Sequence, residues 1–152
     1  MPKVTITART QGAAEVARAF ANLPRQARDE LDEAKTDLSE RLARIVRAAG
    51  RADTAQTARG LGGPANTVRA TGGTTPAVRA GPHPLLFATE FGMDRRSGWY
   101  AAPRYLGSRR RQFRPHRGAS SYWFFRTVDA NQPMIDVAWS QACDAIVRRW
   151  SA

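Results

Sequence analysis

PRQARDELDEAKTDLSERLARIVRAAG, residues 24–50, carries apolar side chains at spacings of three and four. The apolar positions are Ala27, Leu31, Ala34, Leu38, Leu42, Ile45 and Ala49. A stripe with this period lies on one side of a helix and is buried against a core. Pro24 suits the first turn, and Gly50 is expected to end the helix. The stretch therefore predicts one long amphipathic helix of about seven turns.

The residues on either side of this helix predict a small sheet. Residues 4–9 alternate apolar and polar side chains, the period of a half-buried strand, and residues 13–21 read as a short helix. Residues 67–71 and 77–80 are predicted to be two strands, because the Gly/Thr-rich residues between them suit the turn of a hairpin. Residues 85–91 follow as an ordered element, either a strand or a short helix.

A second long helix is predicted at the C-terminal end. Ser120 or Ser121 can cap it, and Pro133 either kinks one helix or starts another. Its apolar stripe comprises Ile135, Trp139, Ala142, Ile146 and Trp150. The sequence thus predicts an α+β domain over residues 1–152. In it a small antiparallel sheet packs against the long N-terminal helix and the C-terminal helix, with a long basic extended loop.

The sequence holds few residues that suit chemistry. His83 and His116 are far apart, and neither has a partner at a metal-ligand spacing, so both are expected in loops. Cys143 lies beside the apolar stripe of the last helix and is interpreted as a packing residue. We therefore expect no enzyme activity, no cofactor and no metal. No apolar stretch is long enough to span a bilayer, so no membrane partner is expected.

Charge is concentrated in one segment, residues 93–126. It holds nine arginines, no lysine and one acid, Asp94, and so carries +8 of the chain's formal +11. Glycine and proline recur through it, which prevents a long helix. Residues 93–118, called the arm below, are therefore predicted to be an extended loop or ribbon.

Three roles for the arm remain open on composition alone. Arginines with aromatic residues can grip phosphates and stack on bases, which favours a nucleic-acid contact. The same residue types are enriched in protein interfaces, which favours an arm between subunits. A solvated loop without a partner is the third role, although its large apolar side chains make this unattractive. Those side chains are Trp99, Tyr100, Tyr105, Leu106 and Phe113.

The order of the predicted elements resembles a known family. The matching segments are Ala88-Thr89-Glu90-Phe91-Gly92, Gln112-Phe113-Arg114-Pro115-His116-Arg117-Gly118, Tyr122-Trp123-Phe124-Phe125-Arg126-Thr127 and Ile135-x-x-x-Trp139. This pattern is similar to the neck proteins of long-tailed bacteriophages described as gene-product-ten-like tail-completion or head–tail connector proteins. The versions in phages of actinobacteria look most similar.

The resemblance implies a structural subunit of a ring, usually of six copies, between the head connector and the tail tube. Its expected location is the neck of the virion, after synthesis in the host cytoplasm. The implied partners are further copies of the chain and other neck and tail proteins, with genomic DNA passing through the lumen without sequence-specific binding. The alternatives are a tail terminator ring that caps the tail tube, or a basic nucleic-acid-binding module using residues 93–126.

This interpretation assigns roles to residues of the arm and of the turn before it. Arginines are expected to pair with acidic patches on neighbouring subunits, and aromatic side chains to be buried anchors. The expected contact residues are Arg95, Arg96, Trp99, Tyr105, Arg109, Arg110, Arg111, Phe113 and Arg114. Glu90, Phe91 and Gly92 are expected to form the turn where the arm leaves the sheet. Gly92 can take a positive φ, and Glu90 can hold an arginine or a backbone amide.

Overall fold

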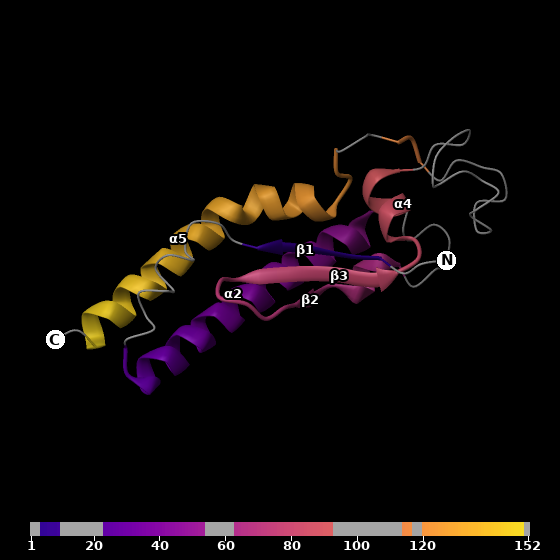
Figure 1. Cartoon of the computed structure of the whole chain (residues 1–152). Helices are drawn as coiled ribbons and strands as arrows, with labels where there is room; N and C mark the ends of the chain where they lie inside the picture. Colours follow the sequence, from indigo (N-terminus) through magenta and orange to yellow (C-terminus); the bar gives the residue numbers. More distant parts are fainter. Residues whose placement is uncertain (1–3, 10–22, 54–62, 93–113, 117–119, 151–152) are drawn as a thin grey trace.

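A computed structural model of the chain describes residues 4–9, 23–53, 63–92, 114–116 and 120–150 (Figure 1). Its elements in chain order are β1 (Val4–Arg9), α2 (Arg25–Ala52), the 3₁₀ helix η2 (Pro64–Thr67), β2 (Arg69–Ala70), β3 (Ala77–His83), α4 (Leu86–Phe91) and α5 (Phe124–Trp150). The predicted α+β arrangement of a small antiparallel sheet with two long helices is confirmed. The short helix predicted over residues 13–21 lies outside the described residues.

The sheet has three antiparallel strands in the order β1-β3-β2, so β3 is central. The predicted hairpin is present, but its first strand is shorter than expected. Thr67 belongs to η2, where its hydroxyl donates to the Pro64 carbonyl at 2.6 Å and accepts the Gly81 amide hydrogen at 2.7 Å. These two bonds take Thr67 out of the ladder, which leaves Arg69–Ala70 as β2.

Helix α2 does not end at Gly50 as predicted but continues to Ala52. Gly50 is buried inside the helix. A Cβ built there would lie 2.6 Å from the Ala65 Cβ and 2.8 Å from ring atoms of Trp123. The residue is therefore glycine because η2 and the start of α5 pack directly on the helix backbone, and not because the helix ends there.

The buried face of α2 also differs from the predicted stripe in its second half. Ile45 is only partly buried, whereas Ala43 and Val46 are fully buried. They join a core that includes Val78 of β3 and Phe124 of α5. The sheet packs on this half of α2. The residues buried there therefore differ from those of the predicted apolar stripe.

Helix α5 runs without interruption through Pro133, so the alternative of two separate helices is wrong. Its end packs on the start of α2 in a second core cluster of Ala27, Trp139, Cys143 and Ile146, which makes the two helices antiparallel neighbours (Figure 1). Cys143 takes the buried place that the sequence pattern gave to Ala142. Burial, and secondarily the charge of Asp144, raises the pKa of the Cys143 thiol to about 11, consistent with a packing role.

Candidate functional site

The candidate site lies where the chain enters and leaves residues 93–113. Gly92 ends α4 with a φ of 78°, the left-handed conformation expected for it. A Cβ at Gly92 would lie 2.0 Å from the Pro115 carbonyl oxygen and 3.0 Å from that of Arg114. The two ends of this part of the arm therefore meet in direct backbone contact. The turn follows a short helix, α4, which is one of the two alternatives predicted for residues 85–91, so the arm leaves from this helix and not from the sheet.

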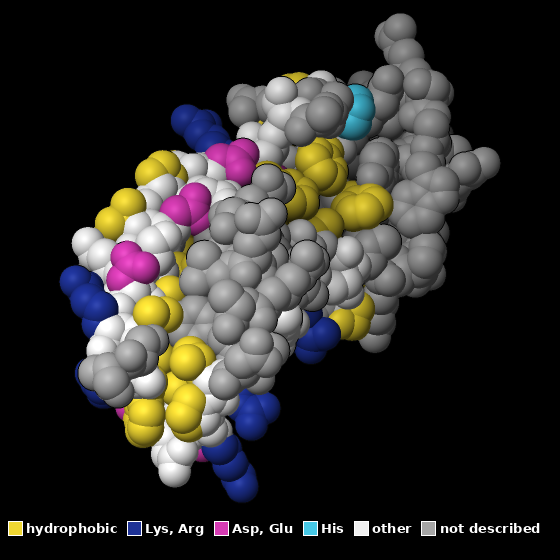
Figure 2. All heavy atoms as spheres, turned by 60° about the vertical axis from the view of Figure 1, so that its left-hand side comes forward, with side chains coloured by type: hydrophobic (Ala, Val, Ile, Leu, Met, Phe, Trp, Pro, Cys, Tyr) yellow, Lys and Arg dark blue, Asp and Glu magenta, His cyan; other side chains and the backbone are white. Residues whose placement is uncertain are grey.

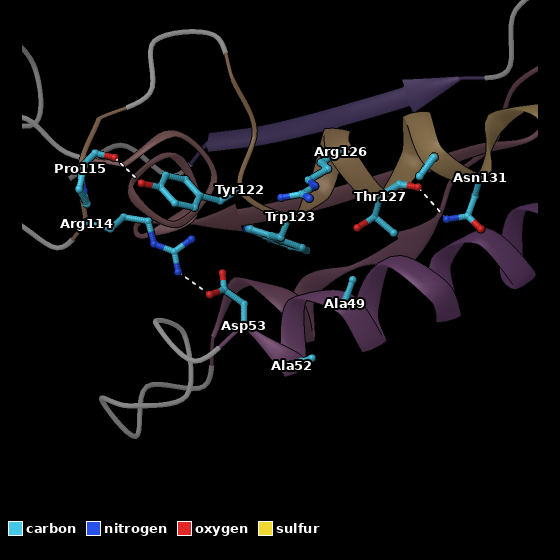
Figure 3. A pocket seen from close by; sticks show the side chains of 11 residues that line it. Ala49, Ala52, Asp53, Arg114, Pro115, Tyr122, Trp123, Arg126, Thr127 and Asn131 are labelled. Carbon is cyan, nitrogen blue, oxygen red and sulfur yellow. Dashed lines mark hydrogen bonds and ion pairs between the residues drawn. The ribbon is translucent and has the colours of Figure 1, made fainter.

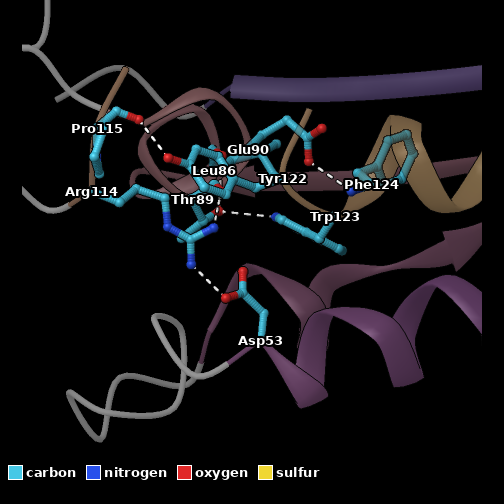
Figure 4. A network of polar contacts seen from close by, with 9 residues as sticks. All are labelled: Asp53, Leu86, Thr89, Glu90, Arg114, Pro115, Tyr122, Trp123 and Phe124. Carbon is cyan, nitrogen blue, oxygen red and sulfur yellow. Dashed lines mark hydrogen bonds and ion pairs between the residues drawn. The ribbon is translucent and has the colours of Figure 1, made fainter. Parts of the chain in front are cut away.

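Arg114 connects this meeting point to three other parts of the fold (Figure 4). One Nη donates to the Thr89 carbonyl at 3.1 Å, and the other pairs with the carboxylate of Asp53 at the end of α2. The guanidinium carbon also lies 4.2 Å from the centre of the Tyr122 ring, a cation–π distance. We call Asp53, Thr89, Gly92, Arg114, Pro115 and Tyr122 the clasp.

The ion pair of the clasp is largely shielded from solvent, whereas Pro115 is exposed. The Arg114 and Asp53 side chains are only 9% and 15% exposed. The Tyr122 hydroxyl donates to the Pro115 carbonyl at 2.7 Å, which closes the clasp on its other side. Arg114 was expected among the residues that contact other subunits, but the structure uses its guanidinium within its own chain.

Glu90 joins α4 to the start of α5. It is fully buried, and its carboxylate accepts the backbone N–H groups of Phe124 at 2.7 Å and Phe125 at 3.3 Å. It also accepts the Ser121 hydroxyl, and the Ser121 oxygen accepts the Arg126 N–H at 3.0 Å. The first three amides of α5, which have no partner inside a helix, are thus all bonded. Of the two partners expected for Glu90, the structure shows the backbone amide.

Burial raises the pKa of Glu90 above its ordinary value of 4.5, although the hydrogen bonds from Ser121, Phe124 and Phe125 oppose the shift. A raised folded pKa means that the folded chain holds this proton more tightly than the unfolded chain does. The contribution of Glu90 to stability is therefore greatest at low pH and declines as pH rises through the folded pKa.

Two further hydrogen bonds attach α4 to the residues before α5, and a third, within α4, orients the Thr89 hydroxyl. The Trp123 indole N–H donates to the Thr89 hydroxyl oxygen at 3.3 Å, and that hydroxyl donates to the Leu86 carbonyl at 2.9 Å. The Tyr122 amide donates to the Glu90 carbonyl at 2.8 Å. Helix α4 is only six residues long, and both its side chains and its backbone are hydrogen-bonded to the residues that precede α5.

A pocket of about 720 Å³ lies beside the clasp, between the end of α2 and the start of α5 (Figure 3). Ala49 and Trp123 contribute apolar surface, and Arg126 and Asn131 lie on the α5 side. The described lining contains no histidine, cysteine or serine.

Most of the predicted contact residues are not covered by the structure. Those outside the described residues are Arg95, Arg96, Trp99, Tyr105, Arg109, Arg110, Arg111 and Phe113. The clasp partners Asp53 and Tyr122 were not predicted from sequence. The sequence gives little indication that Asp53 pairs with Arg114, because the two residues are 61 positions apart.

Within the described ranges, no three His, Cys, Asp or Glu side chains gather as a metal-ligand group. The described helices include none with the length and apolarity needed to cross a membrane. Comparison with protein-family models, with curated proteins and with solved structures finds no match to this chain.

Proposed function

We propose that this protein is a structural subunit of a ring in the neck of a long-tailed bacteriophage, which joins the head connector to the tail tube. In this role the arm reaches neighbouring subunits. The proposal draws on the resemblance carried by Glu90-Phe91-Gly92 and by the order of the elements. The observation that supports it most is the clasp, which brings the residues on either side of residues 93–113 to one place on the fold.

A fixed base matters for an arm that makes protein contacts. The clasp sets where residues 93–113 begin and end, so less conformational freedom is lost when they bind a partner. Arginine and aromatic side chains are the residue types enriched in interface hot spots. A contact between an arm and a different surface of the next copy is head-to-tail, the kind of contact that closes rings.

A nucleic-acid contact is the competing function, and the +8 charge of residues 93–126 favours it. We prefer protein partners because tight binding of DNA in a neck would impede its passage. The two functions differ in a measurable way. If the arm binds DNA, the protein's affinity for DNA should be measurable and should weaken steeply with added salt. If the arm binds protein partners, the chain should form rings and join heads to tails without any affinity for DNA.

The test replaces residues 95–111 by a short Gly-Ser linker, which retains Gly92 and the clasp. Heads and tails of the encoding phage are mixed with wild-type or deleted protein, and infectious particles are counted. We expect the deleted protein to keep its melting temperature and to lose joining. Normal joining by the deleted protein, or salt-sensitive micromolar DNA binding by a wild type that forms no ring, would refute the proposal.

A further inference from the structure

One face of α5 is acidic and apolar, and it is exposed to solvent. Asp129 and Asp144 are exposed and Asp136 is partly exposed. Their spacings of seven and eight residues place them on one side of a helix. Val137 and Val147 lie on the same side and are 57% and 38% exposed, the large hydrophobic side chains most open to solvent among the described residues. Figure 2 shows acidic and hydrophobic side chains along this edge of the molecule, with basic side chains near the two ends of the acidic row.

Among the described residues, no salt bridge pairs the acids on this face with a basic side chain. The sequence has no lysine or arginine between Thr127 and Val147. None of the described salt bridges includes Asp129, Asp136 or Asp144, and one carboxylate oxygen of Asp136 is buried without a hydrogen-bond partner. The α5 face therefore carries no positive charge between Arg126 and Arg148, the exposed arginines at its two ends.

Three of the six acids of α2 are paired, and the helix carries seven basic residues of its own. Asp29 and Asp32 lie within salt-bridge distance of Arg25 and Lys35 on the same helix. Glu30 pairs with Arg149 from α5. Because α2 supplies many of its own cations, the outer face of α5 is the better receptor for an arginine-rich segment.

We propose that the outer face of α5 receives residues 93–113 of a second copy of this chain. The proposal rests on the proposed function, in which the arm reaches a neighbour, and it names the surface that the arm meets. Residues 93–113 hold six arginines and one acid. Their guanidinium groups would pair with the three aspartates, and the arginine stems and aromatic rings would cover the two exposed valines.

Chain geometry favours a second copy over the same copy. Arg109 is five residues from Arg114, so an extended backbone holds it within about 17 Å of the clasp. Arg95 is three residues from Gly92 and is closer still. Asp144 lies twenty residues beyond the start of α5, or about 30 Å along the helix. The five arginines nearest the clasp therefore cannot reach Asp144 of their own chain, and of the six in residues 93–113 only Arg104 has enough chain to do so.

The test uses two proteins with one new cysteine each. S108C places a thiol in the arm, and S140C places one on the exposed α5 face. The native Cys143 can remain, because it is buried and its thiol stays protonated. The two full-length proteins, with tags of different mass, are mixed and oxidised. T36C, on the exposed side of α2, replaces S140C as the matched control.

We expect the S108C–S140C heterodimer to exceed both homodimers and the S108C–T36C product, and to decline with added salt. Equal yields with S140C and T36C would overturn the proposal. A protein carrying both S108C and S140C that forms only an internal disulfide would also overturn it, in favour of an arm docked on its own chain.

Charge reversal gives an independent check. Asp129→Arg with Asp144→Arg is expected to lower the yield of heterodimer roughly tenfold, the effect of about 1.4 kcal/mol. Arg109→Asp with Arg110→Asp in the partner protein should restore part of the yield. If the reversed face leaves joining and cross-linking unchanged while the arm deletion abolishes joining, this inference fails and the proposed function stands. If the arm deletion leaves joining intact, the proposed function itself fails.

Discussion

The two ends of the α2–α5 pair are held together by different interactions. At one end Ala27, Trp139, Cys143 and Ile146 pack as an apolar cluster. At the other end the clasp links the end of α2 to the start of α5 through a shielded ion pair, backbone hydrogen bonds and a glycine contact. Apolar packing tolerates a change of shape better than a polar network does, because an unpaired buried polar group is costly. The clasp thus adds geometric specificity at an end that also packs Trp123 against Gly50, whereas the far end relies mainly on apolar packing.

The apolar end should show the largest loss of stability. Trp139→Ala removes a side chain that is fully buried, and we expect it to lower the free energy of unfolding by about 3–5 kcal/mol. The measurement is urea denaturation. Trp139→Phe is the matched control, and it should cost far less because the indole N–H has no hydrogen-bond partner among the described residues. Equal losses in the two variants would contradict the packing role.

Gly92→Ala should be the most damaging single change at the clasp. The new Cβ would clash with the Pro115 carbonyl, and an alanine would be strained at a φ of 78°. We expect a loss of about 2–3 kcal/mol together with faster proteolysis within residues 93–116. Gly72→Ala is the matched control, because a Cβ there meets nothing within 4 Å. Unchanged stability of Gly92→Ala would show that the clasp is not closed as described.

Loss of the Asp53–Arg114 ion pair should lower the free energy of unfolding by less than Gly92→Ala does. Arg114→Met leaves the Asp53 carboxylate shielded and without its guanidinium partner, and we expect a loss of about 1–2 kcal/mol. Asp53→Asn alone should cost a similar amount. The double variant should cost less than the sum of the two, which a double-mutant cycle in urea would measure. Additive losses would mean that the two groups act separately.

The smallest effect is the pH dependence of Glu90. Since burial raises its folded pKa, wild-type stability should fall as pH rises from about 4.5 to the folded value. The glutamine of Glu90→Gln has no such proton, so the stability of this variant should fall less than that of the wild type over the same pH range. Urea denaturation of both proteins at a series of pH values tests this. Parallel pH profiles would contradict the assignment.

The sequence predicted the elements whose periodicity is regular, and it misplaced the features set by contacts between distant residues. The helical spacing of residues 24–50 predicted α2, and the alternation of residues 4–9 predicted β1. Gly50 was misread because a glycine that ends a helix and a glycine that admits a neighbouring side chain are the same in sequence. Only the position of Ala65 and Trp123 distinguishes the two cases.

The candidate site was predictable in part. The conformation of Gly92 and the amide contact of Glu90 followed from residue type, since glycine tolerates a positive φ and carboxylates accept amide hydrogens. The role of Arg114 did not follow, because nothing local distinguishes it from the other arginines in residues 93–126. Its partners Asp53 and Tyr122 become its neighbours only when α2 and α5 pack together.

The central claim is that the clasp holds an arm that contacts neighbouring copies. Its most direct test is the joining of heads to tails by a variant with Arg109→Glu, Arg110→Glu and Arg111→Glu, whose clasp is untouched. We expect a wild-type urea midpoint and a loss of joining. Joining at the wild-type level by this folded variant would contradict the claim.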